Sequence, residues 1–161
     1  KAASLALVGL SAAFVAIVAR QSAFIDRLGK ASKVTGVAAE TLQKFQFAAE
    51  LAGVSSDQAA VALRRFSRRL GEAQKGTGEL APTLRRLGIN LRDTNGQFKS
   101  AEQVLFELAD GIKNTEGESA KLSIAFKAFD SEGAELVNTL SEGGDALREV
   151  FNRAEALGFV L

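Results

Sequence analysis

The chain lacks several residue types on which protein chemistry commonly depends. Its 161 residues include no Cys, His, Trp, Tyr or Met, and Pro82 is the single proline. Without Cys or His there is no thiol nucleophile, no Ser–His pair, no disulfide and no ordinary zinc site. Only carboxylates, hydroxyls, Lys and Arg remain for chemistry. We expect no enzyme activity, no cofactor and no metal site.

The scarcity of proline accompanies a composition rich in Ala, Leu, Glu, Lys, Arg and Gln. These residues favour helices, and the composition predicts an all-α fold. An apolar fraction of 47% is too high for a disordered chain. Because the chain contains no Met, Lys1 is not a translation start, and we expect the chain to be a fragment of a longer protein.

Charge of one sign does not dominate, since the net charge is +1, but the charges are unevenly distributed. Residues 1–54 carry +3, residues 55–92 carry +5 and residues 93–161 carry −7, and these three values sum to +1. A basic middle followed by an acidic end predicts either ion pairing within the chain or contact between neighbouring copies.

The longest uncharged run covers residues 2–19 and is mostly apolar. As one helix it would be about 27 Å long, slightly short of the hydrocarbon core of a bilayer. The run therefore allows two interpretations, a helix buried in an oligomer and a helix that inserts into a membrane, and the two are compatible at different stages.

Both ends of the chain carry apolar residues at heptad-like spacing. We predict self-association through two seams, which favour two or three strands, with a homotrimer as the expected state. The N-terminal seam begins at Ala3 and contains one polar layer, at Gln21. The predicted self-association residues are Leu7, Leu10, Phe14, Ile17, Gln21, Phe24, Leu28, Leu147, Val150, Ala154, Leu157 and Leu161.

Between the seams, short amphipathic helices and turns predict a compact multi-helix module over residues 34–140. The module would be flanked by a long heptad-bearing helix at 1–31 and by the start of a second associating helix at 143–161. Capping-box pairs predict three helix starts: Ser55 with Gln58, Ser100 with Gln103 and Thr115 with Glu118. Glycines predict helix ends, among them Gly53, Gly71 and Gly88. Gly143–Gly144 is interpreted as a break between two helices.

Residues 89–99 are the predicted exception to helix. Ile89 and Leu91 alternate with polar residues, residues 93–96 read Asp-Thr-Asn-Gly, and Phe98 follows the turn. This pattern predicts a small β-hairpin or a hairpin-like loop.

Three segments resemble blocks found in tape measure proteins of long-tailed bacteriophages. They are residues 42–55 (LQKFQFAAELAGVS), residues 87–105 (LGINLRDTNGQFKSAEQVL) and residues 128–136 (AFDSEGAEL). Their order and intervals are also similar to that family, so the resemblance covers about residues 26–158. It extends equally to prophages and to phage-derived gene transfer agents.

The resemblance implies a function of length rather than of chemistry. Tape measure proteins are long, mostly helical virion proteins that lie in several copies inside the tail tube, and their length sets the length of the tail. They leave through the tail tip ahead of the DNA and have been proposed to help DNA cross the host envelope. The implied partners are further copies of the chain, tail tube proteins, tail tip or hub proteins, and the host membrane.

A paired basic stripe contains Arg64, Arg65, Arg68 and Arg69. It predicts either a solvated face paired with the acidic end of the chain or a surface that binds an acidic partner. Specific nucleic-acid binding is not expected, because no stacking aromatics or recognition helix accompany the arginines.

Some tape measure proteins carry cell-wall hydrolase domains, so we considered Glu118–Ser119 and the acids near 132–145 as catalytic groups. The motifs that should follow a catalytic Glu–Ser are absent, and acids near helix starts are favoured by the helix dipole. Two alternatives to the tape measure role remain open: a membrane-inserting helical protein acting through residues 2–19, and a soluble helical adaptor acting through the basic stripe.

Overall fold

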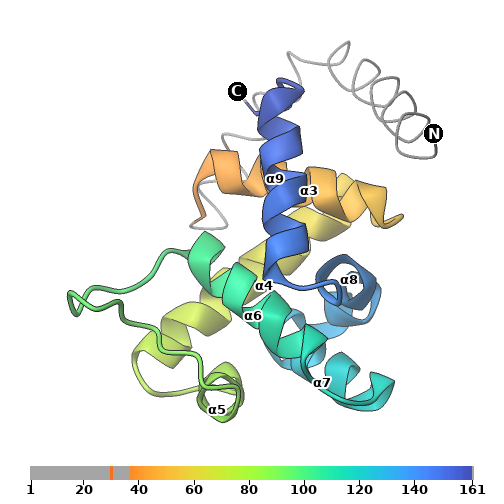
Figure 1. Ribbon diagram of the computed structural model, residues 1–161. Helices are drawn as coiled ribbons and strands as arrows, with labels where there is room; N and C mark the ends of the chain where they lie inside the picture. Colours follow the sequence, from red (N-terminus) through yellow and green to blue (C-terminus); the bar gives the residue numbers. More distant parts are fainter. Residues whose placement is uncertain (1–29, 31–36, 161) are drawn as a thin grey trace.

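Helices follow one another through the part of the chain that the computed structural model describes, Lys30 and residues 37–160 (Figure 1). The predicted all-α fold is confirmed, and these residues form no β-strand. The helices described from first to last residue are α3 (Ala39–Leu51), α4 (Ser56–Gln74), α5 (Leu80–Arg86), α6 (Ala101–Lys113), α7 (Glu118–Phe129), the 3₁₀ helix η1 (Asp130–Glu132), α8 (Gly133–Leu140) and α9 (Gly144–Ala156).

Two of the three predicted helix starts are confirmed. Ser55 caps α4 together with Gln58, and Ser100 caps α6 together with Gln103, each in a reciprocal capping box. The third prediction is wrong, because α7 begins after Gly117 without a side-chain cap. Thr115 instead donates its hydroxyl to the Gly111 carbonyl at 2.6 Å, which satisfies an acceptor near the end of α6.

Two predicted helix ends are also wrong. Helix α4 passes through Gly71 and ends at Gln74, where Gly76 takes the positive φ of 78° that stops it. Helix α9 does not run off the end of the chain but stops at Ala156. Phe159 then turns back, and its ring lies 5.1 Å from that of Phe47.

The segment 89–99 forms a hairpin-like loop with no regular strand. Its ladder consists of one isolated antiparallel bridge between Arg92 and Phe98. The Asp93 carboxylate accepts hydrogen bonds from the backbone N–H groups of Asn95 and Gln97, at 2.8 and 3.0 Å. These local bonds satisfy the turn, and the loop extends away from the helices at the left of Figure 1.

Helix α9 belongs to the same core as the predicted module, since it packs against α3 and α6 (Figure 1). Leu147, Phe151 and Ala154 are buried there, and the Phe151 ring lies 5.3 Å from that of Phe106. The boundary predicted near residues 140–143 therefore does not separate two cores. A second aromatic cluster joins α3, α4 and α7 through Phe45, Phe66 and Phe129.

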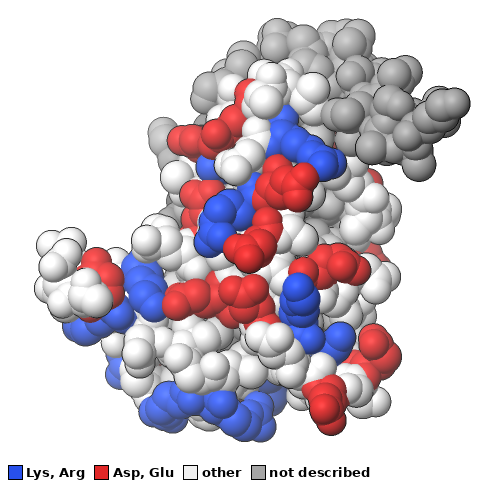
Figure 2. Space-filling view, in the orientation of Figure 1, with Lys and Arg blue, Asp and Glu red and all other residues white. Residues whose placement is uncertain are grey.

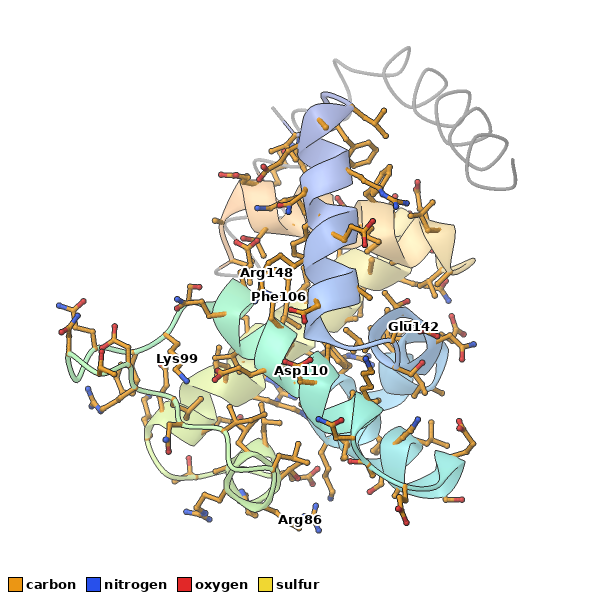
Figure 3. The ribbon with its side chains drawn as sticks, in the orientation of Figure 1. Arg86, Lys99, Phe106, Asp110, Glu142 and Arg148 are labelled. Atoms are coloured by element: carbon orange, nitrogen blue, oxygen red, sulfur yellow. The ribbon has the colours of Figure 1, made fainter. Side chains whose placement is uncertain are left out.

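The break predicted at Gly143–Gly144 is confirmed, since α8 ends at Leu140 and α9 begins at Gly144, and both glycines also allow close packing. A Cβ atom at Gly144 would lie 2.5 Å from the Phe106 carbonyl oxygen, and one at Gly143 would lie 2.7 Å from the side chain of Lys113. The Gly144 N–H donates to the Asp110 carboxylate at 2.8 Å. A side chain of α6 thus provides an acceptor for a backbone donor in the first turn of α9. Asp110 is labelled in Figure 3 beneath the start of α9.

Candidate functional site

The predicted basic stripe on α4 is divided by the fold, and Arg69 is its buried member. Its guanidinium donates to the carbonyls of Phe126 and Lys127 at the end of α7, and to the Asp130 carboxylate at 3.0 Å. Glu79 lies 3.6 Å from the same group. Arg69 thus satisfies acceptors that the end of a helix leaves open, and it is a structural residue rather than part of a free surface.

Arg65 also contacts the chain's own acidic part. It lies 3.4 Å from the Glu132 carboxylate and donates to the Ser131 hydroxyl. Pairing with the acidic end of the chain, the first of the two interpretations of the stripe, therefore describes Arg65 and Arg69. Arg64 and Arg68 are exposed and form no ion pair with any described residue, so partner binding stays a prediction for these two.

A second buried cation, Lys44, joins three helices. Its ammonium lies 2.9 Å from Glu102 on α6, 3.1 Å from Glu155 on α9 and 3.5 Å from Glu40 on its own helix. Burial lowers the pKa of Lys44, but its hydrogen bonds and attraction to Glu102 and Glu155 outweigh burial and raise that pKa above the ordinary 10.5. Lys44 is therefore charged at neutral pH.

The Lys44 cluster was not predicted, because an amphipathic helix is expected to bury only one face. The structure buries nine consecutive residues of α3, 41–49, on all sides. Helical spacing places Leu42, Phe45 and Ala49 on one face. Phe47 and Ala48 are apolar and lie outside that face, and this broad apolar distribution was the available signal.

The predicted self-association residues fall into two groups. Those of the N-terminal seam, from Leu7 to Leu28, lie outside the described residues, as does the candidate membrane segment 2–19. In the C-terminal group, Leu147 and Ala154 are buried inside the chain, Val150 and Leu157 are half-buried, and Leu161 is outside the described residues. The inner face of α9 is thus already occupied by α3 and α6.

The carboxylates considered for catalysis do not converge. Glu118 begins α7, Glu132 pairs with Arg65, and Asp145 pairs with Arg148 at 2.8 Å. Within Lys30 and residues 37–160 there is no group of three acidic side chains suited to a metal ion. Over the same residues no helix has the length and hydropathy to cross a bilayer.

A groove of about 330 Å³ lies between α3, α8 and α9. It offers one carboxylate, from Glu142, and no cation, so it lacks the convergent polar groups that orient a small ligand. Its lining residues are Ala48, Leu51, Ala52, Asn138, Thr139, Glu142, Ala146, Leu147 and Val150.

The surface charges differ between regions of the visible face. Over α9, positive and negative side chains alternate in Figure 2, consistent with the pairs Arg148–Asp145 and Arg153–Glu149. Arg148 also lies over the Phe106 ring, 4.6 Å from its centroid (Figure 3). Along the lower edge, over α5, Figure 2 shows positive side chains gathered together. Arg85 and Arg86, in the last turn of α5, are both exposed.

Comparison with known protein families identifies the family of the chain. The family model of phage-related minor tail proteins matches residues 2–130. The chain belongs to this family. No curated protein and no solved structure matches it.

Membership in the phage-related minor tail protein family gives the chain a structural role in a phage tail and a place in the virion, in association with other tail components. The matched range includes α3 to α7 and stops at Asp130, the residue that Arg69 holds. Helices α8 and α9 lie beyond the match, although they complete the same core.

Proposed function

We propose that this minor tail protein is a segment of a tail tape measure protein. It would contribute to tail length during assembly and leave through the tail tip to assist passage of DNA across the host envelope. The observation that carries the proposal is the family match over residues 2–130, which contains two of the three tape-measure-like blocks and the start of the third. The all-helical fold supports it, because helix length is proportional to residue number.

A folded module measures length differently from a stretched helix. Residues 37–160 as one continuous helix would span about 190 Å, at 1.5 Å per residue. As a folded unit of this size they would have a radius of gyration near 14 Å and measure about 35 Å across. The contribution of this segment to tail length therefore reports its state inside the tail.

In-frame deletion of residues 37–160 from the gene that encodes the chain tests the proposal, with tail lengths measured by electron microscopy. Shortening by about 190 Å would support a stretched ruler, and shortening near 35 Å would support a ruler that retains this fold. Tandem duplication of the same residues is the matched control and should lengthen tails by the same amount. Tails of unchanged length in both variants would contradict the ruler role.

The adaptor alternative is favoured by one observation, the exposure of Arg64 and Arg68 without an ion pair among the described residues. If an acidic tail component binds there, Arg64→Glu with Arg68→Glu should abolish its capture by the purified chain. Arg85→Glu with Arg86→Glu, which makes the same change in net charge on α5, is the control. Equal capture by all three proteins would discard the adaptor role.

A further inference from the structure

Among the described residues, internal pairing leaves more unpaired cations than acids in residues 55–92 and more unpaired acids than cations in residues 93–161. The exceptions are Asp57 and Glu72 in the first range, and Lys113 and Lys121 in the second. In residues 55–92, ion pairs with described residues account for Arg65 and Arg69, and six cations remain without one: Arg64, Arg68, Lys75, Arg85, Arg86 and Arg92. In residues 93–161, Asp93 and Asp110 accept backbone N–H groups. The acids of that range with neither kind of partner among the described residues are Glu116, Glu118, Glu135 and Glu142, all exposed and all near α7 or α8.

Three of the unpaired cations form one ridge on the outer side of α4. Arg64, Arg68 and Lys75 are separated by four and seven residues, so they lie within about 40° of one another along about 16 Å of helix. All three are exposed, and the core-facing residues Leu63 and Phe66 lie on the opposite side of the helix. Asp57 is an exposed acid on the same ridge, at its N-terminal end.

Gly71 lies on this outer ridge, between Arg68 and Lys75. Glycine inside a helix costs about 1 kcal/mol relative to alanine, and it is usually retained where another group approaches closely. Among the described residues nothing approaches: outside the adjacent backbone of α4, a Cβ atom at Gly71 would meet none of their atoms within 4 Å. This differs from Gly144, where the Phe106 carbonyl leaves no space for a side chain. The glycine thus leaves a notch in the cationic ridge that no residue of the described part of the chain fills.

The outer face of α7 has complementary properties. Leu122 and Phe126, one turn apart, are 43% and 46% exposed, and within residues 37–160 they are two of four exposed large hydrophobic residues. Ser119 adds a small residue to this face, and Glu116 and Glu118 lie at the beginning of the helix. Figure 2 shows negative side chains near this end of α7, at the lower right. Lys121 and Lys127 are on the same helix, but Lys127 lies 3.5 Å from Glu79.

Arginine already covers phenylalanine rings elsewhere in this molecule. The Arg92 guanidinium lies 3.9 Å from the centroid of Phe98, and the Arg148 guanidinium lies 4.6 Å from that of Phe106. An exposed Phe126 opposite an arginine-bearing helix would make the same contact. The aliphatic parts of the arginines would cover Leu122.

We propose that the outer ridge of α4 binds the outer face of α7 of a second copy of this chain. Gly71 provides the point of closest approach between the two helices. Arg64 and Arg68 pair with Glu116 and Glu118 and cover Phe126. The contact does not depend on the ruler role, since it requires only two folded copies.

Charge reversal with mixing tests the pairing. Arg64→Glu with Arg68→Glu makes the ridge acidic, and Glu116→Lys with Glu118→Lys makes the α7 face basic. In sedimentation velocity of the full chain at low salt, each variant alone should associate at least tenfold more weakly than the wild type. An equimolar mixture of the two should recover association, because every contact in it again joins opposite charges. Arg85→Glu with Arg86→Glu is the charge-matched control and should change association less than threefold.

Gly71→Gln separates association from folding. Glutamine favours helix and has space at this position, so the melting temperature of the monomer should rise by a few degrees. Its side chain would fill the notch, so association should fall at least tenfold. Phe126→Ser should also weaken association, whereas Leu51→Ser, at an equally exposed leucine on α3, should not.

Three outcomes would overturn the proposal. Both charge variants could associate as strongly as the wild type, or the wild type could fail to associate at any accessible concentration. The third is that mixing the two variants restores no association although their helix content is unchanged. Retained association would assign oligomerisation to other residues. If the ridge variant instead loses binding to a DNA duplex while self-association is unaffected, the ridge is a polyanion site and the second copy is not its partner.

Discussion

Two cations are buried in the part of the chain that the structure describes, Arg69 and Lys44. Each connects several helices, but they bind different kinds of group. Arg69 donates to two backbone carbonyls at the end of α7 and to Asp130. Lys44 is surrounded by side-chain carboxylates, of which Glu155 is 45% and Glu40 58% exposed. Carboxylates on exposed side chains can turn to water if the cation is removed, whereas carbonyls at a packed helix end cannot. This comparison predicts how much stability is lost when a buried cation is removed. The loss depends more on whether its partners can turn to water than on how deeply the cation is buried.

The largest effect is expected from Arg69→Met. Methionine fills much of the same space but donates no hydrogen bond, so the Phe126 and Lys127 carbonyls lose this donor. We expect a loss of about 3 kcal/mol in the free energy of unfolding, measured by urea denaturation. Arg69→Lys should recover less than half of it, because one ammonium cannot reproduce the geometry of the guanidinium. A loss below about 1 kcal/mol would remove the distinction between the two clusters.

Lys44→Met should cost less, about 1 kcal/mol, in the same measurement. The side chain is as buried as that of Arg69, but its partners Glu40 and Glu155 are exposed enough to be hydrated in the variant. Lys44→Arg is the control that keeps the charge and tests the fit of the space. If Lys44→Met destabilises the protein more than Arg69→Met does, the mobility of the partners is not the deciding property.

Alkaline pH tests the Lys44 cluster separately, through the raised pKa of its lysine. The folded pKa of Lys44 is raised above 10.5, so its contribution to stability is fully present below pH 10.5 and is lost as the pH rises through the folded value. The wild type should therefore lose more stability above pH 10.5 than Lys44→Met does. The difference between their urea midpoints at pH 8 and pH 11 measures this, and parallel curves would contradict the assigned pKa direction.

The confirmed helix starts were predictable because their signals are local. Ser55 and Ser100 each act on a residue three positions away, and neither depends on another helix. Thr115 has the same spacing, but its hydroxyl is taken by the Gly111 carbonyl of the preceding helix. Which of two local bonds forms depends on where α6 ends, and a capping pattern alone does not contain that information.

The residues of the basic stripe were predictable from the sequence. Which of them pair within the chain and which stay exposed was not. The spacing of the four α4 arginines indicates a stripe, yet Arg65 and Arg69 are taken by residues more than 55 positions later in the chain. The roles of Lys44 and Gly144 depend on α6 and α9 in the same way, since both act where distant helices meet. Helix periodicity shows which residues share a face, and only packing shows what covers that face.

The smallest net effect is expected at Asp130, the residue that Arg69 holds in an unfavourable conformation. Its φ of 61° and ψ of −142° lie in a region that favours glycine. Asp130→Gly should remove about 1–2 kcal/mol of backbone strain while losing about 1 kcal/mol from the bond to Arg69, so the free energy of unfolding should change little. Asp130→Ala loses the bond without relieving the strain and should be destabilised by about 1 kcal/mol. The difference between the two variants in urea denaturation therefore measures the strain that the arginine cluster maintains, and equal stabilities would mean that the arginine maintains none.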